Sequence, residues 1–286
     1  MLLIRWVFTK INGHLVWATL QQANIVWLAI ACVLFTVSKL LSATRLNIMF
    51  GQINVVLPAP VNRQLYWLGM FYNLFLPGGI GGDAYKVIWL KKAFPAATAL
   101  STGKAVLLDR ISGMMAAVVI LFCMCACIPY FPQIIRVSAL PAALLVSVLY
   151  VWLVKKQFGA FYTSLYITSI YSLGVQLLQC FCVWCLMLAF GINGNLPEYM
   201  LLFLLSSLVA VLPFTLGGIG ARELVFLYGS RYMHLLQGTS VTISLLFYLI
   251  TAVVSLFGLR YFISGKFGLN KALQAVQQSP AVGASV

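Results

Sequence analysis

Apolar runs long enough to cross a membrane recur along the chain, separated by short polar or basic stretches. A helix needs about 20 consecutive apolar residues to span the hydrocarbon core of a bilayer. The pattern therefore predicts an all-α integral membrane protein, a polytopic helical bundle. The predicted spans are residues 23–44, 105–128, 137–154, 165–190 and 239–263.

The two ends of the chain do not show such a run. Residues 1–22 interrupt short apolar stretches with basic residues, which predicts an N-terminal interfacial helix or a shortened first span. Residues 264–286 are mostly small or polar, and we expect a disordered C-terminal tail. The polytopic membrane domain is therefore expected to comprise residues 23–263.

Two further apolar segments, residues 64–90 and 199–235, are interrupted by similar glycine-rich sequences. The first contains LPGGIGGD at 76–83, and the second contains LPFTLGGIGARE at 212–223. Proline ends a helix because it lacks an N–H donor and clashes with the preceding turn. Glycine then allows the chain to reverse. Each segment is predicted to form two short helices joined by a break.

Loop charge gives the orientation of the spans, because cytoplasmic loops carry an excess of Lys and Arg. Loop 191–198 has neither residue type and is predicted to lie outside, with Glu198 solvated. The orientation is consistent only if segments 64–90 and 199–235 leave by the side they enter, as re-entrant hairpins. The basic residues predicted to be cytoplasmic are Lys86, Lys91, Lys92, Lys104, Lys155, Lys156, Arg260, Lys266 and Lys271.

This arrangement predicts an inverted repeat with two broken-helix hairpins. Repeat 1 covers about 23–128 and repeat 2 about 165–263, with a linking helix at about 137–154. Each repeat has a span, a hairpin and a second span, in opposite orientations. Such repeats are typical of transporters whose substrate site lies near the midplane between the halves.

The composition agrees with a membrane protein. Of the 286 residues, 63% are hydrophobic and 8% are charged, with a mean hydropathy of +1.02, whereas soluble domains have about 25% charged residues. The formal net charge is +14, from 18 Lys and Arg against four acids. This charge indicates either the positive-inside bias or recognition of anionic lipid head groups. The basic residues are scattered, which argues against nucleic acid as a partner.

The seven cysteines all lie within apolar runs and predict neither a disulfide framework nor a metal site. Cys123, Cys125 and Cys127 would not converge on one face of a helix, and no histidine is near them in the sequence. We expect no metal, no cofactor and no catalytic residue.

The two breaks supply the candidate substrate-binding site. A helix that begins after a break presents free N–H groups and about half a positive charge, which suits a phosphate or carboxylate. The planar guanidinium group of Arg222 would add several N–H donors. Close helix packing is the alternative explanation for the glycines. The candidate residues are Asn73, Pro77, Gly78, Gly79, Gly81, Gly82, Asp83, Asp109, Arg110, Pro213, Gly217, Gly218, Gly220, Arg222 and Glu223.

The charged candidates admit more than one arrangement. Asp83 can cap its helix, or pair with Arg110 or Arg222. Asp109 and Arg110 can form an interface pair or face a cavity, since charges within spans face the protein interior. Arg222 and Glu223 are adjacent and do not share a helix face, so each is expected to have a different partner.

Three ordered motifs resemble a known family. They are NLFLPGGIGGD at 73–83, LLDR at 107–110 and LPFTLGGIGARE at 212–223. The pattern is similar to the lysylphosphatidylglycerol synthase transmembrane family, over about residues 23–263. The resemblance implies a multi-pass protein of the bacterial inner membrane that moves a lipid or lipid-linked head group between leaflets, with a cytoplasmic C-terminus.

In bifunctional members of that family, a soluble C-terminal domain makes the lipid from aminoacyl-tRNA. Only the polar tail follows residue 263, so we expect a stand-alone member that does not carry out aminoacyl transfer. The leading hypothesis is a flippase-like translocator of an anionic phospholipid. The alternatives are a membrane-embedded transferase acting on a lipid phosphate or polyprenyl carrier, and an accessory subunit that presents lipid to a separately encoded enzyme.

Overall fold

The computed structural model describes residues 23–75, 80–129, 131–211 and 220–263. It is 85% helical, and the described residues include no strand. This confirms the all-α prediction. The helices are α3 (Ile25–Gly51), α4 (Ala59–Phe75), α5 (Gly81–Ala93), α6 (Ala99–Cys127), α7 (Gln133–Gln157), the 3-10 helix η1 (Gly159–Ser164), α8 (Leu165–Ala189), α9 (Leu196–Val209), α10 (Ala221–Tyr232) and α11 (Gln237–Ile263).

Within these described ranges, five helical segments are long and apolar enough to cross a membrane. They are Ile25–Gly51, Ala99–Cys127, Gln133–Gln157, Gly159–Ala189 and Gln237–Ile263, and each contains or largely overlaps one predicted span. The protein is therefore a multi-pass membrane protein. The first span is longer than predicted, since α3 continues two turns past Arg45 to Gly51.

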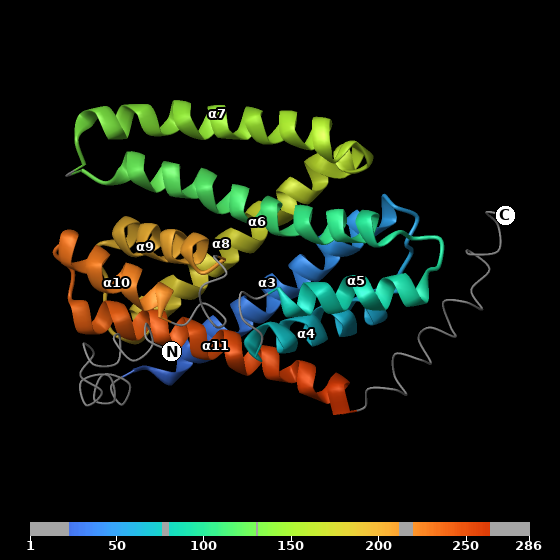
Figure 1. Cartoon of the computed structure of the whole chain (residues 1–286). Coiled ribbons are helices and arrows are strands. Elements are labelled where there is room, and N and C mark those ends of the chain that lie inside the picture. Colours follow the sequence, from blue (N-terminus) through green and yellow to red (C-terminus); the bar gives the residue numbers. More distant parts are fainter. Residues whose placement is uncertain (1–22, 76–79, 130, 212–219, 264–286) are drawn as a thin grey trace.

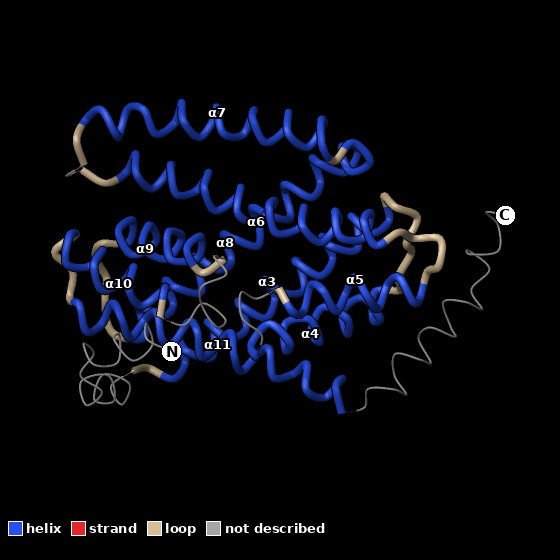
Figure 2. The backbone as a smooth tube through the Cα atoms, viewed as in Figure 1, coloured by secondary structure: helices blue, strands red, loops and turns tan. Residues whose placement is uncertain are grey.

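Both glycine-rich segments lie between two short helices, as predicted. The first separates α4 from α5, and the second separates α9 from α10. Figures 1 and 2 show the α4–α5 pair and the α9–α10 pair toward opposite ends of the bundle. Pro77, Gly78, Gly79, Pro213, Gly217 and Gly218 lie outside the described residues, as do the predicted N-terminal segment and the C-terminal tail.

The helices before and after α7 pack in a matching pattern. α3 and α8, the first helices of the two predicted repeats, pack extensively against each other. α4 packs against α11, and correspondingly α9 packs against α6. These contacts interleave the two halves (Figure 1) and leave polar residues of six helices around one central cavity.

Two buried clusters stabilise the bundle. The larger one includes Phe35, Phe203, Phe226 and Phe247, and the T-shaped contact between Phe35 and Phe247 joins α3 to α11. The second includes Phe50, Leu65 and Leu108, at the end of the bundle where α3 ends. α7 has few buried residues and a largely exposed apolar surface, which suits contact with lipid.

Candidate functional site: a basic cavity between the two halves

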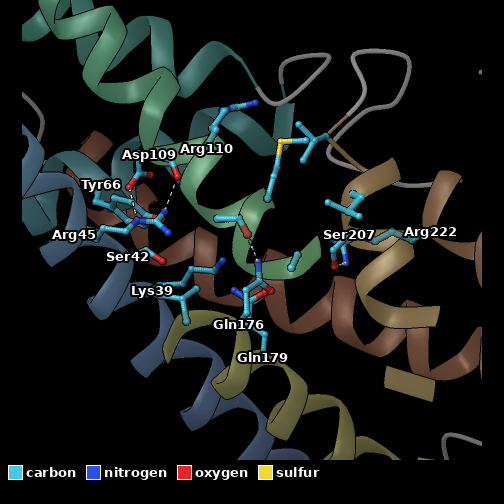
Figure 3. Close-up of a pocket in the computed structure, with 16 residues that line it drawn as sticks. Lys39, Ser42, Arg45, Tyr66, Asp109, Arg110, Gln176, Gln179, Ser207 and Arg222 are labelled. Carbon is cyan, nitrogen blue, oxygen red and sulfur yellow. Dashed lines mark hydrogen bonds and ion pairs between the residues drawn. The ribbon is translucent and has the colours of Figure 1, made fainter. Parts of the chain in front are cut away.

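A cavity of about 230 Å³ is lined by residues of α3, α4 and α6 from the first half of the chain and of α8, α9 and α10 from the second half. Figure 3 shows Arg45 and Asp109 at one wall, Arg222 and Ser207 at the opposite wall, and Lys39 between them. Its lining residues are Lys39, Ser42, Arg45, Tyr66, Asp109, Arg110, Gly113, Met114, Ala117, Val175, Gln176, Gln179, Ser207, Leu208, Val211 and Arg222.

A second cavity of about 300 Å³ adjoins the first. The two share six lining residues, so together they form one region, which we call the central cavity. The second part reaches Asn73 on α4, and Thr251 and Ser255 on α11. The shared residues are Lys39, Tyr66, Arg110, Ser207, Val211 and Arg222.

Asp109 pairs with Arg45 rather than with its neighbour Arg110. Arg45 Nε donates to Asp109 Oδ1 at 2.7 Å, and Arg45 Nη2 donates to the Asp109 carbonyl at 2.9 Å. Arg45 Nη1 donates to Ser172 Oγ on α8 at 2.8 Å. The side chains of Arg45 and Asp109 are 5% and 10% exposed. This buried network joins α3, α6 and α8 and neutralises one cation at the wall.

Asp83 connects three positions across two helices. Its Oδ1 accepts from Lys86 Nζ at 3.1 Å, and its Oδ2 accepts from Arg110 Nε on α6. Of the two ion pairs considered for Asp83, the structure therefore shows the one with Arg110. Lys86 is buried, with its ammonium 4.7 Å from the centroid of the Tyr66 ring. Asp83 thus holds the first turn of α5 beside the central cavity.

Lys39 and Arg222 differ from the other cations of the cavity. Within the described part of the chain, no acidic oxygen lies within 4.0 Å of either one. The Lys39 ammonium lies 4.6 Å from the centroid of the Phe35 ring. Arg222 Nη1 donates a long hydrogen bond of 3.4 Å to Ser207 Oγ, and its guanidinium carbon lies 5.2 Å from the centroid of the Phe247 ring.

Glu223 does not neutralise Arg222. Its Oε2 accepts from the backbone N–H of Gly220 at 2.6 Å, as in a capping box, and its Oε1 accepts from Ser244 Oγ at 3.2 Å. The prediction that these adjacent residues have different partners is confirmed. Because Glu223 already binds the Gly220 N–H, this donor at the start of α10 is not free for a ligand.

The start of α5 is capped in a similar way. Asn73 Oδ1 on α4 accepts from the Gly82 N–H at 2.8 Å. A Cβ atom at Gly82 would collide with the backbone carbonyl of Gly69, so Gly82 allows α4 and α5 to approach closely. Gly82 therefore supports the packing explanation. Neither Gly81 nor Gly82 lines the central cavity, whereas Asn73 does.

One acidic residue is placed differently from the prediction. Glu198 was expected to be solvated in a loop, but it lies in the first turn of α9 and is 6% exposed. The reason is that α9 begins at Leu196, immediately after Asn195, which adopts the left-handed conformation at φ 56°. A carboxylate in the first turn is stabilised by the positive end of the helix.

Several residues of the cavity lie outside the three sequence motifs. None of Lys39, Arg45, Tyr66, Gln176 and Gln179 was among the predicted site residues. A signal was present in the first span, because Ser38, Ser42 and Arg45 recur at helical spacing within an apolar run. Among the described residues, no group of three or more His, Cys, Asp or Glu is placed to hold a metal ion.

Comparison with known proteins assigns the family. The family model of the lysylphosphatidylglycerol synthase transmembrane region matches residues 1–161 and 153–258. The first match begins at residue 1, so the similarity extends further toward the N-terminus than the three motifs indicate. No curated protein matches the chain. The chain therefore belongs to the lysylphosphatidylglycerol synthase transmembrane region family, a family of membrane domains related to lipid function.

Proposed function

We propose that the protein is a flippase-like translocator of an anionic phospholipid or lipid-linked head group, and that the central cavity binds this head group. One observation carries the proposal. Of the residues that the structure describes, four cations line the cavity, Lys39, Arg45, Arg110 and Arg222, against a single acid, Asp109.

The charge balance of the whole chain supports an anionic ligand. The sequence has four acids. Asp109 pairs with Arg45, and Asp83 pairs with Lys86 and Arg110. Glu223 binds Gly220 and Ser244, and Glu198 lies on α9 outside the cavity lining. A charge removed from water is costly unless it is paired. A phosphate held between Lys39 and Arg222 would supply the missing negative charge.

The position of the cavity also supports translocation. We infer that the two glycine-rich hairpins are re-entrant and that the halves form an inverted repeat. In transporters of that kind, the site lies near the midplane between the repeats, and rocking of one half exposes it to either side. The matching contacts of α4 with α11 and of α9 with α6 support such a repeat.

We propose that the protein lies in the bacterial inner membrane with a cytoplasmic C-terminus. We propose that lipid supply and consumption, or an ion gradient, drives net movement. A separately encoded lipid-modifying enzyme would be a natural partner, because it would supply or consume the translocated lipid. The transferase and accessory-subunit hypotheses predict no movement of lipid by the purified protein.

Reconstitution tests the proposal. Head-group-labelled phosphatidylglycerol and phosphatidylcholine would be placed separately in proteoliposomes, and the exchange of label between leaflets followed with a membrane-impermeant quencher. We expect faster exchange of phosphatidylglycerol with the wild type, and at least a tenfold slower rate with Lys39→Gln or Arg222→Gln. Lys104→Gln, at an exposed position on α6, is the matched control. Equal rates in protein-free and wild-type vesicles, with and without a proton gradient, would refute the translocator.

A further inference from the structure

A third cavity, of about 470 Å³, lies away from the central cavity at the surface of the bundle. It is formed by α3, α4 and the last two turns of α11, and we call it the lateral groove. None of its lining residues belongs to the central cavity. The lining residues are Thr36, Leu40, Pro60, Arg63, Gln64, Trp67, Phe257, Arg260 and Tyr261.

The shape of the lateral groove follows from the crossing of α4 and α11. The two helices touch closely at Gly258, where a Cβ atom would lie 2.7 Å from Phe71 Cβ. Trp67 Nε1 donates to the Val254 carbonyl at 3.1 Å and fixes the indole ring at the crossing. Beyond this point the C-terminal end of α11 diverges from α4 (Figure 1), and the groove occupies that side.

Two arginines, Arg63 and Arg260, give the groove a basic character. Both are exposed, and among the described residues no acidic side chain lines the groove. Arg63 lies in the second turn of α4, and Arg260 lies in the last turn of α11. α11 has 27 residues, which corresponds to about 40 Å and exceeds the roughly 30 Å hydrocarbon core. The end of α11 therefore reaches the depth of the lipid head groups.

The rest of the groove and its surroundings are apolar. Its apolar lining residues include Leu40, Trp67 and Phe257. Phe257, which lines the groove, is 60% exposed, so the groove opens at the surface of the bundle, which we infer faces lipid. The groove therefore has two arginines at one end and an apolar lining beside them. This combination suits one phospholipid, with its phosphate at the arginines and an acyl chain along the apolar lining.

We propose that the lateral groove is a second lipid site, which binds an anionic phospholipid from the adjacent leaflet and is distinct from the central cavity. Arg63 and Arg260 contact the phosphate, and Trp67 contacts the acyl chain. The net negative charge of phosphatidylglycerol distinguishes it here from phosphatidylcholine, whose choline ammonium would lie close to the two guanidinium groups.

Trp67 provides a direct readout of occupancy. The full-length protein would be placed in vesicles of phosphatidylcholine containing a fixed fraction of brominated-chain lipid, either phosphatidylglycerol or phosphatidylcholine. Bromine quenches a nearby indole, and comparison with Trp67→Phe isolates the contribution of Trp67. We expect brominated phosphatidylglycerol to quench Trp67 at least twofold more than brominated phosphatidylcholine. The excess should disappear in Arg63→Gln/Arg260→Gln.

Two controls separate the groove from the central cavity and from misfolding. Arg222→Gln, which alters the central cavity, should keep the excess quenching of Trp67. The double arginine variant should keep the wild-type quenching by brominated phosphatidylcholine, which would show that the surroundings of Trp67 are preserved. Equal quenching by the two lipids in the wild type would overturn the proposal, as would an excess that persists in the double variant. Both outcomes are independent of whether the protein moves lipid.

Discussion

Asp83 and Arg110 lie 27 positions apart and form an ion pair that attaches the first turn of α5 to α6. Asp83 also accepts from Lys86, so one carboxylate serves two cations. The glycine-rich sequence before α5 and the charged LLDR sequence in α6 are therefore parts of one arrangement. The pair places the α4–α5 hairpin beside the central cavity.

Asp83→Asn should lower the thermal unfolding temperature of the detergent-solubilised protein, because Lys86 and Arg110 would lose their carboxylate. We expect a cost of about 1–3 kcal/mol, below that of a fully buried pair because Arg110 is partly exposed. A double-mutant cycle with Arg110→Gln checks the assignment. Additive effects of the two substitutions would show that the pair contributes no coupling energy.

Asp109→Asn should be more destabilising than Asp83→Asn. The side chains of Arg45 and Asp109 are 5% and 10% exposed, so Arg45 would remain as a buried charge without its carboxylate. We expect a loss of about 3–5 kcal/mol, measured by thermal or chemical unfolding. The double variant Arg45→Met/Asp109→Leu should regain part of that loss. If Asp109→Asn has the smaller effect of the two, burial does not decide the strength of these pairs.

Gly82→Ala should destabilise the protein, although alanine favours helix. The new Cβ would collide with the Gly69 backbone and force α4 and α5 apart. Gly103→Ala is the matched control, since a Cβ there meets nothing within 4 Å in the described structure. The control should be neutral or up to about 1 kcal/mol more stable. Similar unfolding temperatures for the two variants would contradict the close approach of α4 and α5.

Cysteine labelling in a cysteine-free background should reveal the topology of the hairpins. We expect Val56→Cys and Lys92→Cys, which flank the α4–α5 hairpin, to react with an impermeant reagent from the same side. Asn193→Cys and Leu236→Cys, which flank the α9–α10 hairpin, should react from the opposite side. All four positions are exposed. Reaction of Val56→Cys and Lys92→Cys from different sides would mean that the first hairpin crosses the membrane.

The sequence by itself determined the membrane class, the helical spans, the two broken segments and the family. These features depend on runs of apolar residues and on proline and glycine, whose effects are local and can be read along the chain. The pairing of Asp83 with Arg110 could also be proposed from the sequence, because the chain has only four acids and each had few candidate partners.

Only the tertiary structure decided which polar residues share a cavity. Lys39, Gln176 and Arg222 come from three helices far apart in the sequence, and packing of α3 against α8 brings the first two together. Lys39 lies within the predicted span 23–44 and Arg45 directly follows it, but the sequence does not show that both line a cavity on a helix that continues to Gly51. Helix packing determines which face of a span contacts protein and which contacts lipid. It therefore also determines that Arg45 and Arg110 have acidic partners, whereas Lys39 and Arg222 have none among the described residues.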